Sequence, residues 1–295
     1  MNHLLDIKHL SLSDIQALLA QAYAFKKGAT KRFLSIKLAN LFYENSTRTR
    51  ISFELAAYNL GLAVVNVDLA RSSETKGETI EDTLTNLAAM GIDIGVIRHS
   101  QAYLPHTLAQ TLKTMSIINV GDGQHAHPSQ ALLDVMTILE HKDQPKKITV
   151  VGDLLHSRVA RSLHDIFLLM DWTDVHWVAP SAWQLPDISC GQITTSLDEG
   201  LTDSEVIICL RVQKERFLAE EALDLDAYQT QFKLTKAKLK QANPAAIVMH
   251  PGPVNRGVEL DVEVMQSTQS VILKQVTNGV WMRMAILNRC IEILA

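Results

Sequence analysis

At residues 42–50 the sequence reads Phe-Tyr-Glu-Asn-Ser-Thr-Arg-Thr-Arg, and here a short apolar run ends and a helical pattern begins. The change predicts a strand followed directly by a helix, with hydroxyl and guanidinium groups at the helix N-terminus. Free N–H groups and the helix dipole favour an anion there, and arginine adds paired donors that match phosphate. We interpret Ser46 to Arg50 as an anion-binding turn. For this segment alone, a plain cap at Asn45 or Ser46 with solvated arginines is the alternative.

The strand-then-helix pattern recurs outward from this stretch, since short runs rich in Val and Ile alternate with segments of helical period. This alternation is typical of βαβ units and parallel sheets. The expected strands cover residues 37–42, 63–68, 93–99, 116–120, 147–152, 174–179, 191–195, 205–211 and 246–250. The expected helices cover 46–60, 78–90 and 128–141, and a final amphipathic helix starts near Gln275. Gly61 and Gly91 follow two of these helices, where a left-handed residue is favoured.

The length of 295 residues is enough for two domains of ordinary size. We therefore predict an α/β fold class with two lobes, each a mostly parallel open sheet flanked by helices, and a cleft between them. A polar stretch at 142–147 follows the helix at 128–141. We place the junction along that helix and loop, which divides the chain into domains 1–130 and 131–274.

Composition excludes several classes of partner. Lys and Arg number 28 against 32 Asp and Glu, and no long run of like charge occurs, so a nucleic-acid surface is not indicated. The amino terminus lacks the pattern of a signal peptide, and no apolar stretch reaches membrane-spanning length. Three cysteines, Cys190, Cys209 and Cys290, are far apart in apolar contexts, as is typical of reduced core thiols. We expect a cytoplasmic protein with no membrane or nucleic-acid partner.

Polar residues follow the predicted strands repeatedly, at the positions where ligands bind in open α/β sheets. They are Arg98, His127, Gln130, Arg158, Arg211, Gln213 and the pair Pro251-Gly252. Arg211 and Gln213 share one face of an extended chain and would suit a carboxylate. Each residue alone has an ordinary alternative, since an arginine at a strand end is more often a surface ion pair.

Metal and cofactor motifs are weak. The pair His125-x-His127 suggests a metal, but a site needs further ligands at matching strand ends, and the sequence offers no convincing set. Gly152 is the one glycine of a strand-to-helix turn, so the three-glycine dinucleotide motif is not supported. We expect no metal and no cofactor.

Taken in order, these motifs resemble the aspartate carbamoyltransferase family over essentially the whole chain. The matching segments are Ser-Thr-Arg-Thr-Arg at 46–50, Ser72 with 76–79 and 82–83, Arg98-His99, 121–123 with 127–130, Gly152-Asp153 with Arg158, 211–216, and His250-Pro251-x-Pro253. The departures are Ser129 for a frequent Thr, Gly252 at a variable position, and the additional imidazole of His125. Ornithine carbamoyltransferases share 46–50 but typically carry His-Cys-Leu-Pro where this chain has 250–253, and lack the Arg-x-Gln.

The resemblance implies transfer of the carbamoyl group from carbamoyl phosphate to the α-amino group of L-aspartate, an early step of de novo pyrimidine biosynthesis. It implies that residues 1–130 bind carbamoyl phosphate, with the helix at 275–295 packing back on them, and that residues 131–274 bind aspartate. The alternatives are transfer to another amino acid such as ornithine, or a non-catalytic binding paralogue. The resemblance further implies a closed homotrimer with active sites shared between subunits, and dihydroorotase or regulatory chains are additional partners that it allows.

The resemblance also assigns site residues. Those for carbamoyl phosphate are Ser46, Thr47, Arg48, Thr49, Ser72, Arg98, His127, Gln130 and the main chain of Pro251 and Gly252. Those for aspartate are Lys76, Arg158, Arg211 and Gln213. Those expected to act in catalysis are Arg48, Thr49, Lys76, Arg98 and His127. The implied chemistry is direct attack by the amine, with an oxyanion stabilised by donors and no covalent intermediate.

Overall fold

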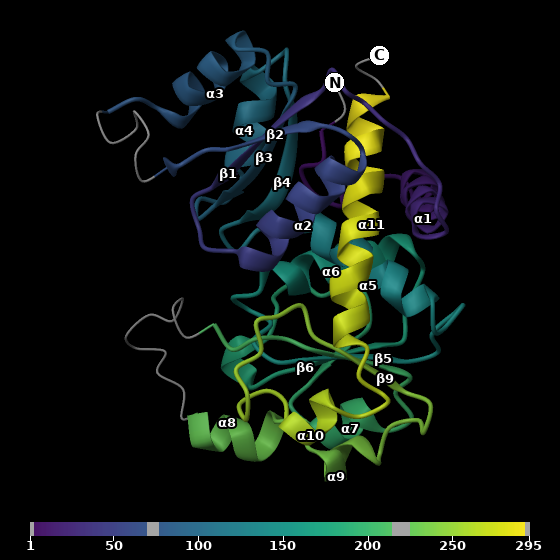
Figure 1. Cartoon of the computed structure of the whole chain (residues 1–295). Coiled ribbons are helices and arrows are strands. Elements are labelled where there is room, and N and C mark those ends of the chain that lie inside the picture. Colours follow the sequence, from purple (N-terminus) through teal and green to yellow (C-terminus); the bar gives the residue numbers. More distant parts are fainter. Residues whose placement is uncertain (1–2, 70–76, 214–224, 293–295) are drawn as a thin grey trace. The chain divides into compact units, whose positions relative to one another are not determined.

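A computed structural model describes residues 3–69, 77–213 and 225–292. The chain divides into two compact units (Figure 1). The first consists of Met1–Leu133 with Val276–Ala295, and the second of Asp134–Gln275. Within the described residues, no helix combines the length and the apolar character that a membrane crossing needs.

The first unit contains a 4-stranded parallel sheet in the order β2-β1-β3-β4. Its strands are β1 (Lys37–Phe42), β2 (Ala63–Asn66), β3 (Ile94–His99) and β4 (Ser116–Asp122). Strand β4 is buried along its whole length, whereas the edge strand β2 is largely exposed. Helices cover both faces of a parallel sheet, so its buried strands have nearly continuous apolar sequences. Such apolar runs are the basis on which the strands were predicted.

The helices assigned to the first unit lie around this sheet (Figure 1). They are α1 (Leu12–Lys26), α2 (Thr47–Asn59), α3 (Ile80–Ala89), α4 (Leu104–Thr111) and the greater part of α11 (Ile272–Ile291). Helices α1 and α3 start with capping boxes, Ser11 with Asp14 and Thr79 with Asp82. Gly61 and Gly91 take φ of +75° and +85° just after α2 and α3, which confirms their predicted place.

The second unit contains a 5-stranded parallel sheet in the order β7-β6-β5-β8-β9. Its strands are β5 (Ile148–Val151), β6 (Val175–Val178), β7 (Gln192–Thr194), β8 (Val206–Cys209) and β9 (Ile247–Met249). Its helices are α6 (Arg158–Leu169), the short 3-10 turn η3 (Ser181–Trp183), α7 (Leu197–Leu201), α8 (Leu225–Phe232), α9 (Lys236–Leu239) and α10 (Val262–Met265). The predicted α/β class with two parallel sheets is confirmed.

The division between the units falls inside two helices, α5 (Pro128–Leu139) and α11. The first and last residues of the second unit, Asp134 and Gln275, are joined by a buried hydrogen bond of 2.9 Å from Gln275 Nε2 to Asp134 Oδ1. Helix α11 starts at Ile272, one turn before the predicted start at Gln275. The sequence pattern predicts no range for α1, for α4 or for the helices between α5 and α11.

Candidate active site

The turn that opens α2 is built as an anion site would require. Ser46 occupies the N-cap position in an extended conformation, with φ −158° and ψ 90°, yet its side chain makes no capping hydrogen bond. The first turn of α2 contains no acidic residue that would offset the helix dipole. Thr47 and Arg48 are exposed and Thr49 is buried. A side-chain cap by Ser46 is therefore not formed here.

The neighbouring Arg50 fits the ordinary alternative. Its side chain is exposed, and its Nε lies 3.7 Å from the carboxylate of Glu54, one helical turn further on. Such an exposed pair is worth only a few tenths of a kcal/mol, so Arg50 is a solvated helix residue. The two arginines of this segment thus have different surroundings.

Arg98 lies at the same edge of the sheet as the turn at 46–49. Phe42 and Arg98 are register partners in β1 and β3, and Tyr43 N donates to Arg98 O at 2.9 Å. The guanidinium of Arg98 donates from Nη1 to Val120 O at 3.3 Å, and its Nε lies 3.3 Å from Glu44 Oε2. These contacts hold a largely buried cation beside the carboxyl ends of β1, β3 and β4.

His127 and Gln130 are placed by the loop that follows β4. Asp122 at the end of β4 is fully buried and accepts hydrogen bonds from Tyr103 N at 2.7 Å and Ala126 N at 3.0 Å, which fold the loop back. Gln130 N then donates to His127 O at 3.0 Å in the first turn of α5, and both side chains are more than nine-tenths buried. Because β1, β3 and β4 run parallel, their carboxyl ends share one edge, and the structure brings these residues to it.

In the second unit, Asp153 joins the segments that follow β5 and β8. Its buried carboxylate accepts from His156 N at 3.1 Å and from Gln213 N at 3.2 Å. Gln213 Nε2 donates in turn to His156 O at 3.2 Å. Arg158 is the first residue of α6, directly after the N-cap Ser157, and is 4 % exposed. The arginine and the amide predicted to hold aspartate thus belong to one hydrogen-bonded pair of turns.

Gly152 makes this arrangement of β5 and β8 possible. Its φ is +138°, and a Cβ at this position would lie 2.5 Å from Leu210 O. Only a residue without a side chain allows the two strand ends to approach so closely. The glycine that the sequence offered as a weak dinucleotide signal therefore has a packing role.

Glu259 is a positioning residue that the sequence analysis missed. Its carboxylate is 1 % exposed and accepts from Val212 N at 2.8 Å, from Asn255 N at 2.9 Å and from Asn255 Nδ2 at 2.7 Å. Burial raises the pKa of Glu259, although the hydrogen bonds from Val212 and Asn255 oppose the shift. Glu259 thereby fixes Val212, which lies between Arg211 and Gln213.

The main chain at Pro251 and Gly252 is fixed by His250 and Gln275. His250 N donates to Gln275 Oε1 at 2.9 Å, and the buried ring of His250 accepts at Nδ1 from Gly252 N at 2.8 Å. Gly252 has a φ of +68°, which a glycine adopts without strain. The carbonyl groups that the sequence analysis singled out therefore belong to a rigid turn after β9.

Two predicted site residues, Ser72 and Lys76, lie outside the described residues, as does the segment 214–216. The described site residues fall into two sets. Ser46, Thr47, Arg48, Thr49, Arg98, His127 and Gln130 belong to the first unit, and Arg158, Arg211, Gln213, Pro251 and Gly252 belong to the second.

Two parallel sheets with cationic and amide groups beyond their strand ends define an α/β protein that binds anionic ligands. A family model described as the carbamoyl-P binding domain of aspartate/ornithine carbamoyltransferase matches residues 2–140, and one described as its Asp/Orn binding domain matches residues 144–290. The chain belongs to the aspartate/ornithine carbamoyltransferase family. The resemblance inferred from the sequence motifs is confirmed.

Relatives and solved structures agree with this assignment. An aspartate carbamoyltransferase catalytic subunit of Legionella pneumophila is 53 % identical, with 99 % of each chain covered. One of Coxiella burnetii is 47 % identical, covering 97 % of this chain and 94 % of the relative. Aspartate transcarbamoylase of Trypanosoma cruzi in complex with carbamoyl phosphate and aspartate has a TM-score of 0.86 at 31 % identity, covering 97 % of this chain and 95 % of the other. The same enzyme in complex with N-(phosphonacetyl)-L-aspartic acid has a TM-score of 0.87 at 32 % identity and covers 97 % and 94 %.

Proposed function

We propose that this chain is an aspartate carbamoyltransferase, which converts carbamoyl phosphate and L-aspartate to N-carbamoyl-L-aspartate and phosphate in the pathway to pyrimidines. The observation that carries the proposal is the edge of the first sheet, where the turn at 46–49, Arg98 and His127 lie at the carboxyl ends of three adjacent parallel strands. The family model described as carbamoyl-P binding covers that unit. Relatives with this name match nearly the full chain.

The proposed roles follow from the charge of carbamoyl phosphate. The first turn of α2, with Ser46, Thr47, Arg48 and Thr49, meets the phosphate dianion with main-chain N–H groups and one guanidinium. Ser72 belongs to the same set. The carbonyl oxygen of the substrate gains negative charge as the amine attacks, and Thr49, Arg98 and His127 stabilise it. Gln130 and the main-chain oxygens of Pro251 and Gly252 hold the carbamoyl NH₂ group.

Arg158, Arg211 and Gln213 then hold the two carboxylates of aspartate, with Lys76 as a further contact. Arginine suits this task because its planar donors match a carboxylate. Ornithine carries an ammonium group where aspartate carries its second carboxylate, so the same arginines disfavour it. The amine attacks directly, and the departing phosphate accepts its proton. The residues from 1 to about 130, with the helix at 275–295, form the carbamoyl phosphate-binding domain in this proposal, and 131–274 the aspartate-binding domain.

The test is phosphate release from carbamoyl phosphate with L-aspartate, with L-ornithine, and with no acceptor. We expect rapid release with aspartate, at least about 100-fold slower release with ornithine, and only the spontaneous rate without an acceptor. A faster rate with ornithine would identify the other branch of the family. A rate that aspartate does not change would leave only the binding paralogue.

We further propose a cytoplasmic homotrimer whose active sites combine residues of two subunits. The support is the resemblance together with the chain position of Lys76, between β2 and α3, and three buried free thiols fit a reducing compartment. If Lys76 serves the site of a neighbour, Arg48→Ala and Lys76→Ala subunits can complement each other. Equal amounts that exchange freely leave about one quarter of the sites intact, because each of two chains must be the right variant.

A second mixture is the matched control. Arg48→Ala with Arg98→Ala affects two residues that the proposal draws from the same chain, so no assembly restores a site and the mixture should stay inactive. Recovery in the first mixture alone supports shared sites. If neither mixture recovers although subunits exchange, each chain builds its site alone.

A further inference from the structure

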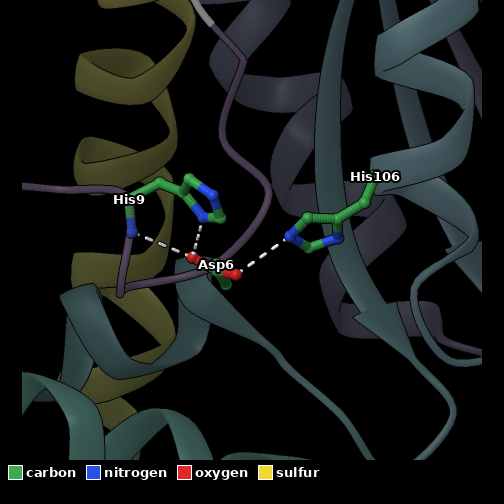
Figure 2. Close-up of side chains that lie close together, drawn as sticks. All are labelled: Asp6, His9 and His106. Carbon is green, nitrogen blue, oxygen red and sulfur yellow. Dashed lines mark hydrogen bonds and ion pairs between the residues drawn. The ribbon is translucent and has the colours of Figure 1, made fainter.

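A second group of polar side chains lies outside the residues assigned to catalysis (Figure 2). Two imidazoles approach the one buried carboxylate of Asp6, with His9 Nδ1 2.6 Å from Oδ1 and His106 Nε2 2.9 Å from Oδ2. Three potential ligand atoms, one from each residue, lie within 4.8 Å of one another. Figure 2 shows both rings turned toward the carboxylate, one from each side.

We propose that Asp6, His9 and His106 bind a single divalent transition-metal ion of the zinc type, at a site separate from the catalytic residues. Two imidazole nitrogens and one carboxylate oxygen are ligands that Zn²⁺ prefers, and a water molecule would complete a tetrahedron. The ion would cross-link two segments of the chain, because Asp6 and His106 are 100 residues apart.

The distances fit a site that opens slightly to admit the ion. With metal–ligand bonds of about 2.0–2.1 Å, the ligand atoms of a tetrahedral zinc site are about 3.3 Å apart. The two observed contacts, 2.6 and 2.9 Å, are hydrogen bonds, in which each imidazole contributes a proton that the metal would replace. The side chain of His9 is 65 % exposed, so it can retreat by the few tenths of an ångström required and gives the ion a path from solvent.

The main chain already holds the ligands in place. Leu4 N donates to Ile117 O at 2.9 Å, and Asn119 Nδ2 donates to Leu5 O at 2.7 Å, so the segment before Asp6 is bound to β4. His9 N donates to Asp6 Oδ1 at 3.0 Å, which orients the carboxylate as outer partners of metal ligands commonly do. His106 stands in the first turn of α4. The ligands are therefore carried by ordered elements of one unit.

A neighbouring group, His106 with Asp122 and His125, fits a metal less well. The carboxylate of Asp122 accepts from three donors that a metal would not replace, which are Tyr103 N, Ala126 N and Asn119 Nδ2. Its task is to fold the loop before His127. The described partners of Asp6 are the two imidazoles and one main-chain N–H, so both oxygens have room for an ion once the imidazole protons leave.

The experiment uses the full chain without an affinity tag, freed of metal with a chelator, and Co²⁺ as the probe. We expect one equivalent of Co²⁺ to give the visible absorption of a tetrahedral site and Zn²⁺ to displace it. His9→Ala should weaken Co²⁺ binding at least tenfold while leaving the fold and carbamoyl transfer unchanged, because His9 is exposed and its main-chain bond to Asp6 remains. His141→Ala, which changes a half-buried histidine of the second unit, should bind Co²⁺ as the wild type does.

Thermal unfolding supplies a second readout. Zn²⁺ should raise the unfolding temperature of the wild type, since an ion bound to the native state stabilises it by mass action, and should not do so for His9→Ala. Absence of stoichiometric Co²⁺ binding to the wild type overturns the proposal. Equal Co²⁺ affinity in the wild type, His9→Ala and Asp6→Asn overturns it as well, and binding lost only in His125→Ala would assign the ion to the neighbouring group instead.

Discussion

Ser46 stands at the N-cap of α2 without using its hydroxyl as a cap. A serine cap is typically worth about 1 kcal/mol of helix stability, which this helix start forgoes. The sequence alone left open whether the segment caps the helix or binds an anion. The unused hydroxyl and the absence of an acid in the first turn favour the anion.

We expect Arg48→Ala to abolish turnover and to leave the fold intact, because the side chain is exposed and its removal opens no cavity. Loss of one charge-assisted phosphate contact costs about 1.5–3 kcal/mol in binding, and more where the contact also supports the transition state. Steady-state kinetics with carbamoyl phosphate and circular dichroism check both parts. Arg50→Ala, two residues on, is the matched control and should stay near the wild type. If Arg48→Ala and Arg50→Ala lost similar activity, the cause would be the change in net charge rather than the loss of one phosphate contact.

Arg211 is expected to select the side-chain carboxylate of aspartate. Arg211→Ala should raise the KM for aspartate far more than that for carbamoyl phosphate, because binding of the second substrate is what is removed. The KM of Arg211→Lys for aspartate should lie between those of the wild type and Arg211→Ala, since lysine keeps the charge but loses the paired donors. Initial rates over a grid of both substrates separate the two constants. An equal rise in both would point to a structural role.

Glu259 should make stability depend on pH in an unusual direction. Burial raises its pKa above the ordinary value of 4.5, so the folded chain holds this proton more tightly than the unfolded chain. The stabilisation is complete below pH 4.5 and is lost as the pH rises through the raised native value. Glu259→Gln should remove this slope, at the cost of about 1–3 kcal/mol for the donor of Asn255 or Val212 left unsatisfied. Denaturant midpoints of both proteins, measured between about pH 4.5 and 8, test this prediction. It would be refuted if the stability of Glu259→Gln depended on pH as strongly as that of the wild type.

At the scale of elements, the sheets were predictable and the helix starts less so. Every predicted strand is present, but most end a residue or two early, where the ladder stops. Runs of Val and Ile mark buried strands such as β4, β5 and β8, whereas β1 contains neither residue. Helix α4 begins after Tyr103, whose φ is +64°. Residues other than glycine seldom adopt this left-handed conformation, so the sequence does not indicate that a helix starts here. Helix α1 was missed although Ser11 and Asp14 form a readable capping box.

That capping box yields a prediction. Ser11→Ala should destabilise the first unit by about 1 kcal/mol, whereas Ser11→Thr should restore most of the loss. Hydrogen bonds from the side chain and main chain of Ser11 lower the pKa of Asp14 below 3.8, so the box stabilises above that pH and its contribution is lost as the pH falls through the lower native value. Urea unfolding at neutral and acid pH measures both effects. If Ser11→Ala lost the same stability at neutral and at acid pH, the capping box of Ser11 and Asp14 would be excluded as the cause.

The candidate site shows the same limit of sequence analysis. Arg98, His127 and Arg158 could be found because each lies at the carboxyl end of a predicted strand or in the turn that follows it. The residues that hold the site together could not be found in this way, because their hydrogen bonds join distant parts of the chain. Glu259 and Val212 are 47 residues apart, and Gln275 and Asp134 are 141 residues apart. In the sequence, only His125 and His127, which are two residues apart, suggest a metal. Asp6 and His106 are 100 residues apart, and only the fold brings them together.

At the scale of the molecule, the first unit is built from two separate parts of the chain. From residue 276 onward α11 contributes to it, and Arg283 lies over the ring of Phe53 at 5.3 Å while Lys26 Nζ donates to Asn278 Oδ1 at 2.9 Å. Buried apolar residues of this helix are Met282, Met284, Ala285, Ile286, Leu287, Cys290 and Ile291.

A chain ended at Gln275 should therefore keep the second unit and lose a stable first unit. Each buried Leu, Ile or Met removed costs about 2–5 kcal/mol, more in total than a domain commonly has to spare. Hydrogen exchange read by mass spectrometry tests this. We expect slow exchange to persist in β5 and β8 and to vanish in β1 and β3. Slow exchange that persists in β1 and β3 would show that α11 is dispensable.

The return of α11 to the first unit also sets an order of events on the ribosome. Residues 1–133 are synthesised first, yet the helix that completes their unit follows only after the whole of 134–275 has been made. At about 5–20 residues per second, that interval is roughly 7 to 30 seconds. During it, the apolar surface that α11 later covers is open to chaperones and to neighbouring nascent chains, while the second unit can already close its own sheet. The part of the protein that leaves the ribosome first is the part that finishes folding last.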